Sequence, residues 1–212
     1  MKPSRPRRRR SPSPWGRALM RGQALPARTM PRVVLPALLI VAAGVVTYWN
    51  SLHHPFIWDD QTAIVTNPTI QHLWPLSGPL TPPRETPVAG RPIVNLSFAL
   101  NYAFGGLTET GYHVVNLAIH IACALLLFGI VRRTPGSPGP GGRAGPAPFF
   151  AAVVALLWMV HPLQSEVVNY VTQRSESLMA LFLFLTLYGA IRAAESPAWR
   201  ALSVIACACG MA

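Results

Sequence analysis

Charged residues, and acidic ones above all, are scarce in this chain. Of its 212 residues, 12% are charged and only 7 are Asp or Glu, whereas a soluble domain carries about 25% charged residues. Cysteine is also rare: Cys123, Cys207 and Cys209 are the only three, and all fall in apolar runs. These absences exclude an ordinary soluble domain and a disulfide-stapled secreted module, and they indicate no metal site.

Long apolar blocks take the place of charge. Hydrophobic residues make up 51% of the chain, and roughly 20 of them in a row cross a bilayer as a helix. The sequence therefore predicts an all-α integral membrane protein, a multi-spanning helical bundle with four or five spans in this chain. The predicted spans are about 33–50, 112–131, 147–161, 176–192 and 200–212. They form a membrane domain, 32–212, after a disordered basic tail, 1–31.

The few charges lie unevenly around these spans. Among 18 Lys and Arg, only Arg84, Arg91 and Arg174 fall in the alternate loops, whereas six of the acids do. Because basic loops stay in the cytoplasm, the N-terminus is predicted to be cytoplasmic and the loop 51–111 external. We interpret the Arg7–Arg10 run as binding anionic lipid rather than nucleic acid. The preference for Arg over the single Lys2 favours a bacterial inner membrane, with the endoplasmic reticulum as the alternative.

The external loop 51–111 contains a short amphipathic segment. Prolines punctuate its middle, and beyond them Ile93, Leu96, Leu100 and Phe104 recur at helical spacing. At about 12 residues, this segment is too short to span and is predicted to lie in the headgroup plane with its apolar face down. The segment includes Asn95-Leu96-Ser97, which matches an N-glycosylation acceptor.

Two adjacent acids, Asp59 and Asp60, follow Trp58 directly after the first span. A carboxylate there can take a proton from an attacking hydroxyl while its neighbour orients the nucleophile or a metal. An arginine, Arg91 or Arg174, is placed to neutralise a phosphate leaving group. This combination suits transfer from a lipid phosphate to a hydroxyl. The alternative for the two acids is a helix cap or a loop turn.

Polar residues also occur within or beside the later spans. His113, Asn116 and His120 share one face of the second span, where they serve either a site or hydrogen bonding between helices. His161 closes the third span. Glu166 precedes Arg174, the only basic residue nearby, so a salt bridge from Arg174 to Glu166 or Glu176 is the structural alternative to a binding role.

Several short motifs in order resemble the membrane domain of the transmembrane and tetratricopeptide-repeat O-mannosyltransferases and their bacterial relatives. They are Phe56–Asp60, Gly90–Ile93, Leu100–Tyr102, Gly111–Asn116, His161–Val168 and Gln173–Glu176. The resemblance implies a glycosyltransferase of the C-type membrane fold that transfers mannose, with inversion, from a polyprenyl-phosphate donor to a protein Ser or Thr hydroxyl outside the cytoplasm.

The same resemblance implies roles for particular residues. Asp59 or Asp60 is the candidate catalytic base, and Arg91, His161, Glu166 and Arg174 are candidate substrate-binding residues. His113 is added to the candidate substrate-binding residues because it lies at the external end of the second span. The implied partners are membrane lipid, a lipid-linked sugar and a protein acceptor, with a divalent metal as an optional cofactor. Family members carry further spans and a repeat array, so the chain is expected to be the N-terminal portion of a longer enzyme and inactive alone. The alternatives are a non-catalytic membrane scaffold and a transporter component.

Overall fold

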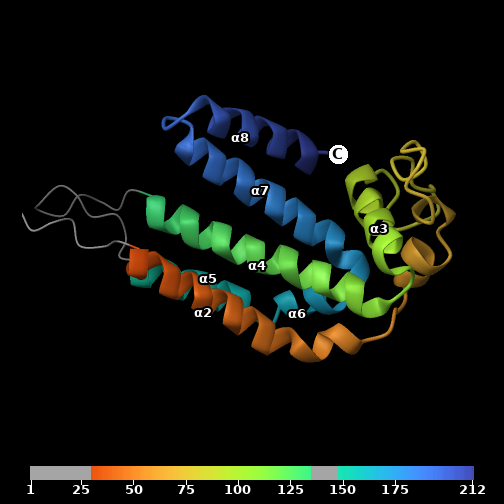
Figure 1. Cartoon of the computed structure of the whole chain (residues 1–212), viewed down its shortest axis with the longest axis horizontal. Helices are drawn as coiled ribbons and strands as arrows, with labels where there is room; N and C mark the ends of the chain where they lie inside the picture. The colour runs from red at the N-terminus through yellow and green to blue at the C-terminus, as the bar shows by residue number, and fades with distance from the viewer. Residues whose placement is uncertain (1–29, 135–147) are drawn as a thin grey trace, which may run out of the picture.

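Helices that run alongside one another form the body of the molecule (Figure 1). They are α2 (Met30–Tyr48), α4 (Glu109–Arg133), α5 (Pro148–Met159), α7 (Arg174–Arg192) and α8 (Pro197–Gly210). This computed structural model describes residues 30–134 and 148–212, so nearly all of the predicted basic tail lies outside the described residues. No strand occurs in these two stretches, which confirms the predicted all-α membrane fold.

Three helical segments are long and apolar enough to cross a bilayer: Val33–His53, Glu109–Arg133 and Val171–Arg192. The first of these combines α2 with the short 3-10 helix η1 (Trp49–His53). α5 and α8 have 12 and 14 residues, which is less than the roughly 20 that span hydrocarbon without help from flanking residues. The predicted count of four or five spans therefore stays a prediction.

Small residues bring α2, α4 and α5 close together. Ala151, Ala152 and Ala155 lie on the buried face of α5 and join a core shared with α2 and α4. On the same side, a Cβ added to Gly44 of α2 would lie 2.9 Å from the Ile121 side chain. Small residues of this kind permit close approach between helices in lipid, where burial of apolar surface gives no advantage over contact with acyl chains. The outer faces carry exposed apolar side chains, among them Leu38, Leu39, Val46, Leu157, Leu183 and Leu187.

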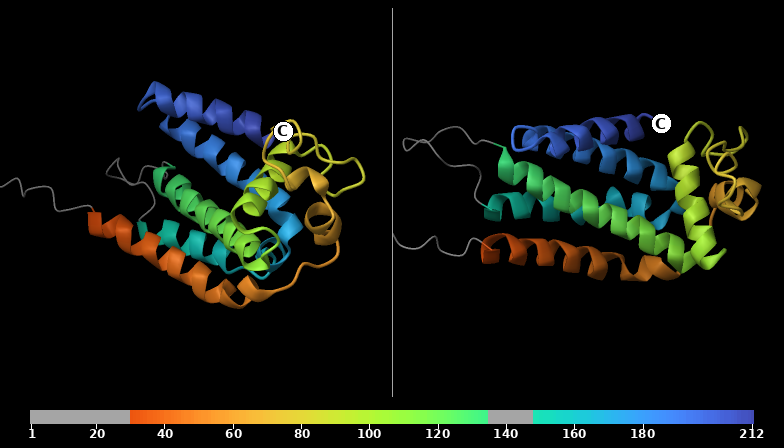
Figure 2. Two further views of the ribbon diagram at one scale, coloured as in Figure 1. Left: turned by 45° about the vertical axis from the view of Figure 1, so that its right-hand side comes forward. Right: turned by 45° about the horizontal axis from the view of Figure 1, so that its top comes forward.

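The predicted external loop is folded and caps one end of the bundle. It contains a π-helical turn, η2 (Gln61–Val65), a 3-10 turn, η3 (Pro68–Ile70), and α3 (Pro92–Gly105). α3 crosses the direction of the long helices at this end of the molecule (Figure 2). The cap has a core of its own, which includes the starts of α4 and α7: Ala63, Ile64, Ile70, Val88, Val94, Phe98, Ala99, Tyr112, Val171 and Leu178.

α3 presents two different faces. Val94, Phe98 and Ala99 are buried in the cap core, whereas Leu100 and Phe104 are exposed. The helix thus has an exposed apolar strip of the kind that the headgroup-plane prediction requires, although its depth in a bilayer stays a prediction. The glycosylation match within it is wrong for a physical reason. Asn95 is fully buried, and its amide nitrogen donates to the hydroxyl of Thr69 and to the carbonyl of Pro79, so no sugar can reach it.

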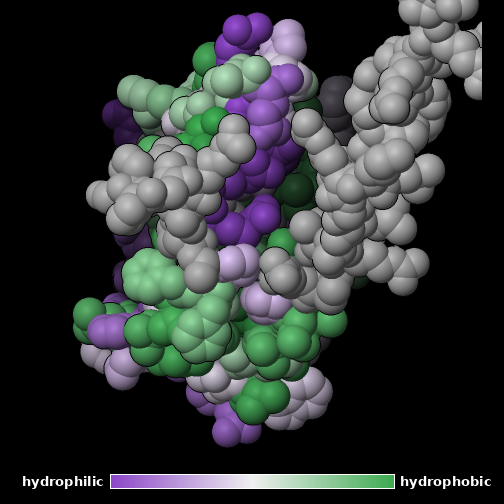
Figure 3. Space-filling view, turned by 90° about the vertical axis from the view of Figure 1, so that its left-hand side faces the viewer, coloured by the Kyte–Doolittle hydropathy of each residue, from purple (hydrophilic) through white to green (hydrophobic). Residues whose placement is uncertain are grey.

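Ion pairs join the helices at the opposite end of the bundle. Glu195, between α7 and α8, accepts from Arg133 of α4 at 2.8 Å and from Arg192 of α7 at 2.6 Å. Figure 3 looks onto this end and shows hydrophilic residues gathered between hydrophobic ones. The Arg192 guanidinium also stacks 3.9 Å from the Trp199 ring centroid, which fixes α8 against α7.

Candidate active site at the capped end of the bundle

The two adjacent aspartates have different surroundings. Asp60 is 1% exposed, and its Oδ1 accepts hydrogen bonds from the backbone N–H and the hydroxyl of Thr172. Its Oδ2 accepts from the backbone N–H of Ile57 at 3.1 Å. A buried carboxylate is costly unless its oxygens are hydrogen-bonded. The bonds to Thr172 therefore hold the loop after α2 against the short segment that precedes α7. Asp60 is therefore occupied in a structural contact.

Asp59, by contrast, is exposed. Its backbone N–H donates to the phenolic oxygen of Tyr170 at 2.9 Å. The preceding Trp58 has φ +49°, a left-handed conformation that costs a bulky residue about 1–3 kcal/mol. This turn in the chain lets Asp60 enter the protein while the Asp59 side chain stays outside. Of the two predicted bases, Asp59 is the one that a substrate can reach.

A cavity of about 470 Å³ lies beside Asp59. It is lined by His54, Pro55, Ile57, Trp58, Glu166, Asn169 and Tyr170. Burial raises the pKa of the Tyr170 phenol, and the carboxylates of Asp59 and Asp60 raise it further. The phenol therefore stays protonated at neutral pH and keeps a proton to donate. Glu166, predicted as a substrate-binding residue, lines this cavity, and Asp59 is next to two of its lining residues, Trp58 in the chain and Tyr170 by the hydrogen bond.

Arg174 lies away from this cavity and is fully buried. Its guanidinium donates to Asn116 Oδ1 at 2.7 Å, to Asn101 Oδ1 at 2.6 Å and to the Tyr112 carbonyl at 2.9 Å. It also lies 4.7 Å from the ring centroid of Phe98. The salt bridge considered from the sequence is wrong, because the described contacts of Arg174 are to neutral oxygens and aromatic faces rather than to Glu166 or Glu176. Arg174 ties the cap to α4 and α7.

The polar stripe on α4 is used for contacts between segments. Nε2 of His113 lies 3.0 Å from the carbonyl of His54, and Nε2 of His120 lies 3.1 Å from the carbonyl of Met159. Asn116 donates to the carbonyl of Val171 at 3.2 Å. His113 thereby contacts the backbone of His54, which is one of the residues that line the cavity. This arrangement matches the interhelical alternative for Asn116 and His120.

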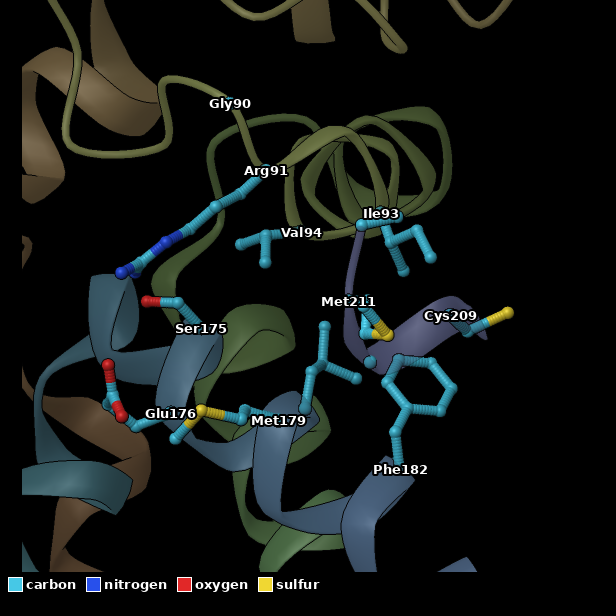
Figure 4. Close-up of a pocket in the computed structure, with 13 residues that line it drawn as sticks. Gly90, Arg91, Ile93, Val94, Ser175, Glu176, Met179, Phe182, Cys209 and Met211 are labelled. Atoms are coloured by element: carbon cyan, nitrogen blue, oxygen red, sulfur yellow. The ribbon is translucent and has the colours of Figure 1, made fainter. Parts of the chain in front are cut away.

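Arg91 lines a different cavity, of about 290 Å³ (Figure 4). Its side chain extends from the start of α3 toward the start of α7, where Ser175 and Glu176 lie. His161 is exposed in the turn after α5, where its Nδ1 accepts from the Leu163 N–H at 3.3 Å. Of the predicted site residues, Glu166 lines the first cavity, Asp59 is adjacent to its lining residues Trp58 and Tyr170, and His113 contacts its lining residue His54. Arg91, His161 and Arg174 do not line it.

The described part of the chain contains no preformed set of metal ligands. No group of three or more His, Cys, Asp or Glu side chains comes together there at metal-binding distances. The optional divalent cofactor stays a prediction.

Six of the seven residues that line the cavity were not predicted as site residues: His54, Pro55, Ile57, Trp58, Asn169 and Tyr170. Tyr170 follows Glu166 at i+4, so a shared helical face was the available signal. No such signal pointed to His54 and Asn169, because these two residues are far apart in the sequence and approach each other only in the folded protein. Ser51 donates to Asn169 Oδ1 across this junction.

Comparisons with known proteins point to one family. No family model matches the chain, and no solved structure does either. It is, however, 32% identical over 184 residues to human Protein O-mannosyl-transferase TMTC4, a match that covers 77% of this chain and 24% of that protein. The chain belongs to the TMTC family of protein O-mannosyl-transferases.

Further TMTC relatives agree. The chain is 30% identical to Protein O-mannosyl-transferase tmtc2 of Xenopus laevis, over 73% of this chain and 18% of the relative. It is 31% identical to Protein O-mannosyl-transferase Tmtc3 of Drosophila melanogaster, over 71% of this chain and 18% of the relative. The chain thus spans at most about a quarter of the length of these relatives. The family resemblance seen in the short motifs is confirmed.

Proposed function

We propose that this chain carries the catalytic loop of a membrane glycosyltransferase. In this proposal, mannose passes from a polyprenyl-phosphate donor to a protein Ser or Thr hydroxyl on the non-cytoplasmic side. The main observation behind this proposal is that the two aspartates have different surroundings. Asp60 is buried and hydrogen-bonded, while Asp59 is exposed beside a cavity at the end of the bundle. The names of the TMTC relatives support the reaction class.

Asp59 acts as the general base in the proposed reaction. Its carboxylate takes the proton of the acceptor hydroxyl, and the hydroxyl oxygen forms a bond to the anomeric carbon. The bond from that carbon to the phosphate oxygen breaks on the opposite face, and its electron pair leaves with the polyprenyl phosphate. Attack opposite to departure inverts the anomeric centre. A phosphate is a sufficiently good leaving group to need no protonation, so one base is enough.

Arg91 is the proposed partner of the leaving phosphate, and because it lines a different cavity from Glu166 and Trp58, it would meet the phosphate and not the sugar. It is exposed, whereas the Arg174 guanidinium is buried and engaged with protein oxygens. A guanidinium is always charged and matches phosphate geometry, so an accessible arginine near the bilayer surface is suited to this role. The divalent cation remains an optional addition to this part of the proposal.

Replacement of Asp59 by Asn tests the proposal. Mannosyl transfer is measured in membranes from cells that express the full-length protein, with Glu85→Gln as a matched control because Glu85 is an exposed carboxylate of the same cap. Loss of the base is expected to lower the rate by about 10²–10⁴-fold in Asp59→Asn and to leave Glu85→Gln unchanged. Unaltered transfer in Asp59→Asn would contradict the proposal, and unaltered cellular function without any transfer would favour the non-catalytic scaffold.

A further inference from the structure

One exposed indole borders the cavity beside Asp59. Trp58 is 84% exposed, lines the cavity and has φ +49°. The exposed indole and the strained backbone both destabilise the folded protein, and the indole gains little packing in compensation. Strain of this kind concentrates at ligand-binding sites, where the ligand supplies the missing contact. The indole therefore presents a flat binding face.

One polar group beside that face, the Glu166 carboxylate, only accepts hydrogen bonds. Glu166 is exposed, and the one contact that the described residues give its carboxylate is from Gln173 Nε2 at 3.4 Å. A carboxylate accepts up to about four hydrogen bonds, so most of its capacity is open to a ligand. No lysine or arginine occurs among the described residues that line the cavity. This lining suits a ligand with several hydrogen-bond donors, and it supplies no cation for a phosphate, so the phosphate of the proposed donor would lie outside it.

The shape of the site favours a ring with hydroxyl groups. A pyranose presents C–H bonds on one face, and their slightly positive hydrogens meet the negative face of an indole. Its hydroxyls point outward from the ring edge, where they reach carboxylate and phenol groups. The cavity volume of about 470 Å³ lies within the range of roughly 300–1,000 Å³ that small-molecule sites occupy.

We propose that this cavity is a hexose subsite, with the sugar ring stacked on Trp58 and its hydroxyls donating to Glu166. The Tyr170 hydroxyl, which accepts from the Asp59 N–H at 2.9 Å, donates its proton to a sugar oxygen. This assignment rests on the proposed function, since it makes the subsite the place where the transferred sugar waits beside Asp59. Trp58 is then a specificity-determining residue that selects a ring with an apolar face.

Two other occupants are less well supported. A quaternary ammonium headgroup needs several aromatic faces around one point, yet within residues 30–134 and 148–212 the Trp58 indole packs against no other ring. Insertion of Trp58 into lipid would explain its exposure but leaves the adjacent carboxylate of Glu166 and the cavity without a role. Both are outcomes that the experiment below distinguishes.

Binding of methyl α-D-mannopyranoside to the purified full-length protein in lipid nanodiscs tests the subsite. Saturation-transfer NMR without any donor lipid reports which ligand protons touch the protein. We expect ring C–H signals in the wild type and about a tenfold weaker affinity in Trp58→Leu. The matched control is Trp74→Leu, which removes an equally exposed tryptophan of the cap and is expected to bind as the wild type does.

The outcomes separate the subsite from the transfer reaction. Choline chloride that competes with the mannoside, quenching of Trp58 fluorescence by brominated lipid chains, or equal binding by Trp58→Leu would each overturn the subsite. Near-wild-type melting temperature in Trp58→Leu shows that a lost signal is not misfolding. Mannoside binding that persists in Asp59→Asn, together with lost transfer, supports both proposals, whereas binding with unaltered transfer overturns only the role of Asp59.

Discussion

The buried guanidinium of Arg174 is the costliest single group in the described core. It is fully buried and donates to oxygens of Ser97, Asn101, Tyr112 and Asn116. A buried charge is tolerated only when its donors are satisfied, and the planar guanidinium supplies donors in a fixed fork that a lysine cannot reproduce. Arg174 therefore joins the cap helix α3, the start of α4 and the start of α7 at one point.

Arg174→Lys is expected to destabilise the protein by about 2–3 kcal/mol. The charge stays buried, but an ammonium cannot reach acceptors on three segments at once. The apparent melting temperature in nanodiscs is the measurement, and Arg84→Lys is the control because Arg84 is exposed in the cap. Equal melting temperatures in the two variants would show that the guanidinium geometry contributes nothing.

At the scale of residues, the sequence singled out particular side chains but not their surroundings. Asp59, Glu166 and Arg174 were all singled out, and their placement follows from facts that a sequence cannot carry. Asp60 is buried because Thr172, 112 residues later, offers it two donors. Arg174 is paired with neutral amides because α3 brings Asn101 to it. Such long-range partners exist only after the helices have packed.

At the scale of elements, α7 and α8 pack closely enough for their backbones to approach each other. A Cβ added to Gly189 of α7 would lie 3.1 Å from the carbonyl oxygen of Trp199 and 3.0 Å from Cβ of Ser203. The hydroxyl of Ser203 also donates to the carbonyl of Thr186 at 2.9 Å. Glycine here permits the close approach that membrane helices use in place of the hydrophobic effect.

Gly189→Ala is expected to cost about 1–3 kcal/mol, because backbone atoms of α8 must move away from the new methyl group. Gly105→Ala is the matched control, since a Cβ at the end of α3 would meet no atom within 4 Å. Thermal unfolding in nanodiscs compares the two. A stability of Gly189→Ala equal to that of the control would mean that α7 and α8 do not pack as described.

The elements themselves were largely readable from the sequence. The long apolar runs gave α2, α4 and α7, and the helical spacing of Ile93, Leu96 and Leu100 gave α3 (Pro92–Gly105). The rest of the cap was not foreseen as a folded unit. Its short turns are stabilised by its own core and by side-chain contacts such as the hydrogen bond between Asn67 and Asn95, 28 residues apart. Local periodicity of the sequence cannot predict contacts over such a separation.

At the scale of the whole molecule, the bundle has two chemically different ends. The cap and the cavity beside Asp59 lie at one end, and the ion pairs of Glu195 with Arg133 and Arg192 lie at the other. The positive-inside rule predicts that the second end faces the cytoplasm. The proposed reaction then takes place on the far side of the membrane.

Cysteine labelling tests this sidedness. In a background with Cys123, Cys207 and Cys209 changed to Ala, we expect Glu85→Cys to react with an impermeant maleimide on sealed cells. Ala194→Cys is expected to react only after permeabilisation. Both positions are exposed, so accessibility of the side chain is not limiting. The reverse pattern would place Asp59 in the cytoplasm and contradict the proposed reaction.

The separation of Asp60 from its partner Thr172 also determines when their hydrogen bonds can form during biosynthesis. Translation adds about 5–20 residues per second, so the 112 residues between Asp60 and Thr172 represent a delay on the order of ten seconds. Throughout that interval, the Asp60 carboxylate lacks its two donors from Thr172. The loop that carries Asp59 and Asp60 therefore completes its hydrogen bonds only after the segment before α7 has been made, so the proposed site forms late in assembly.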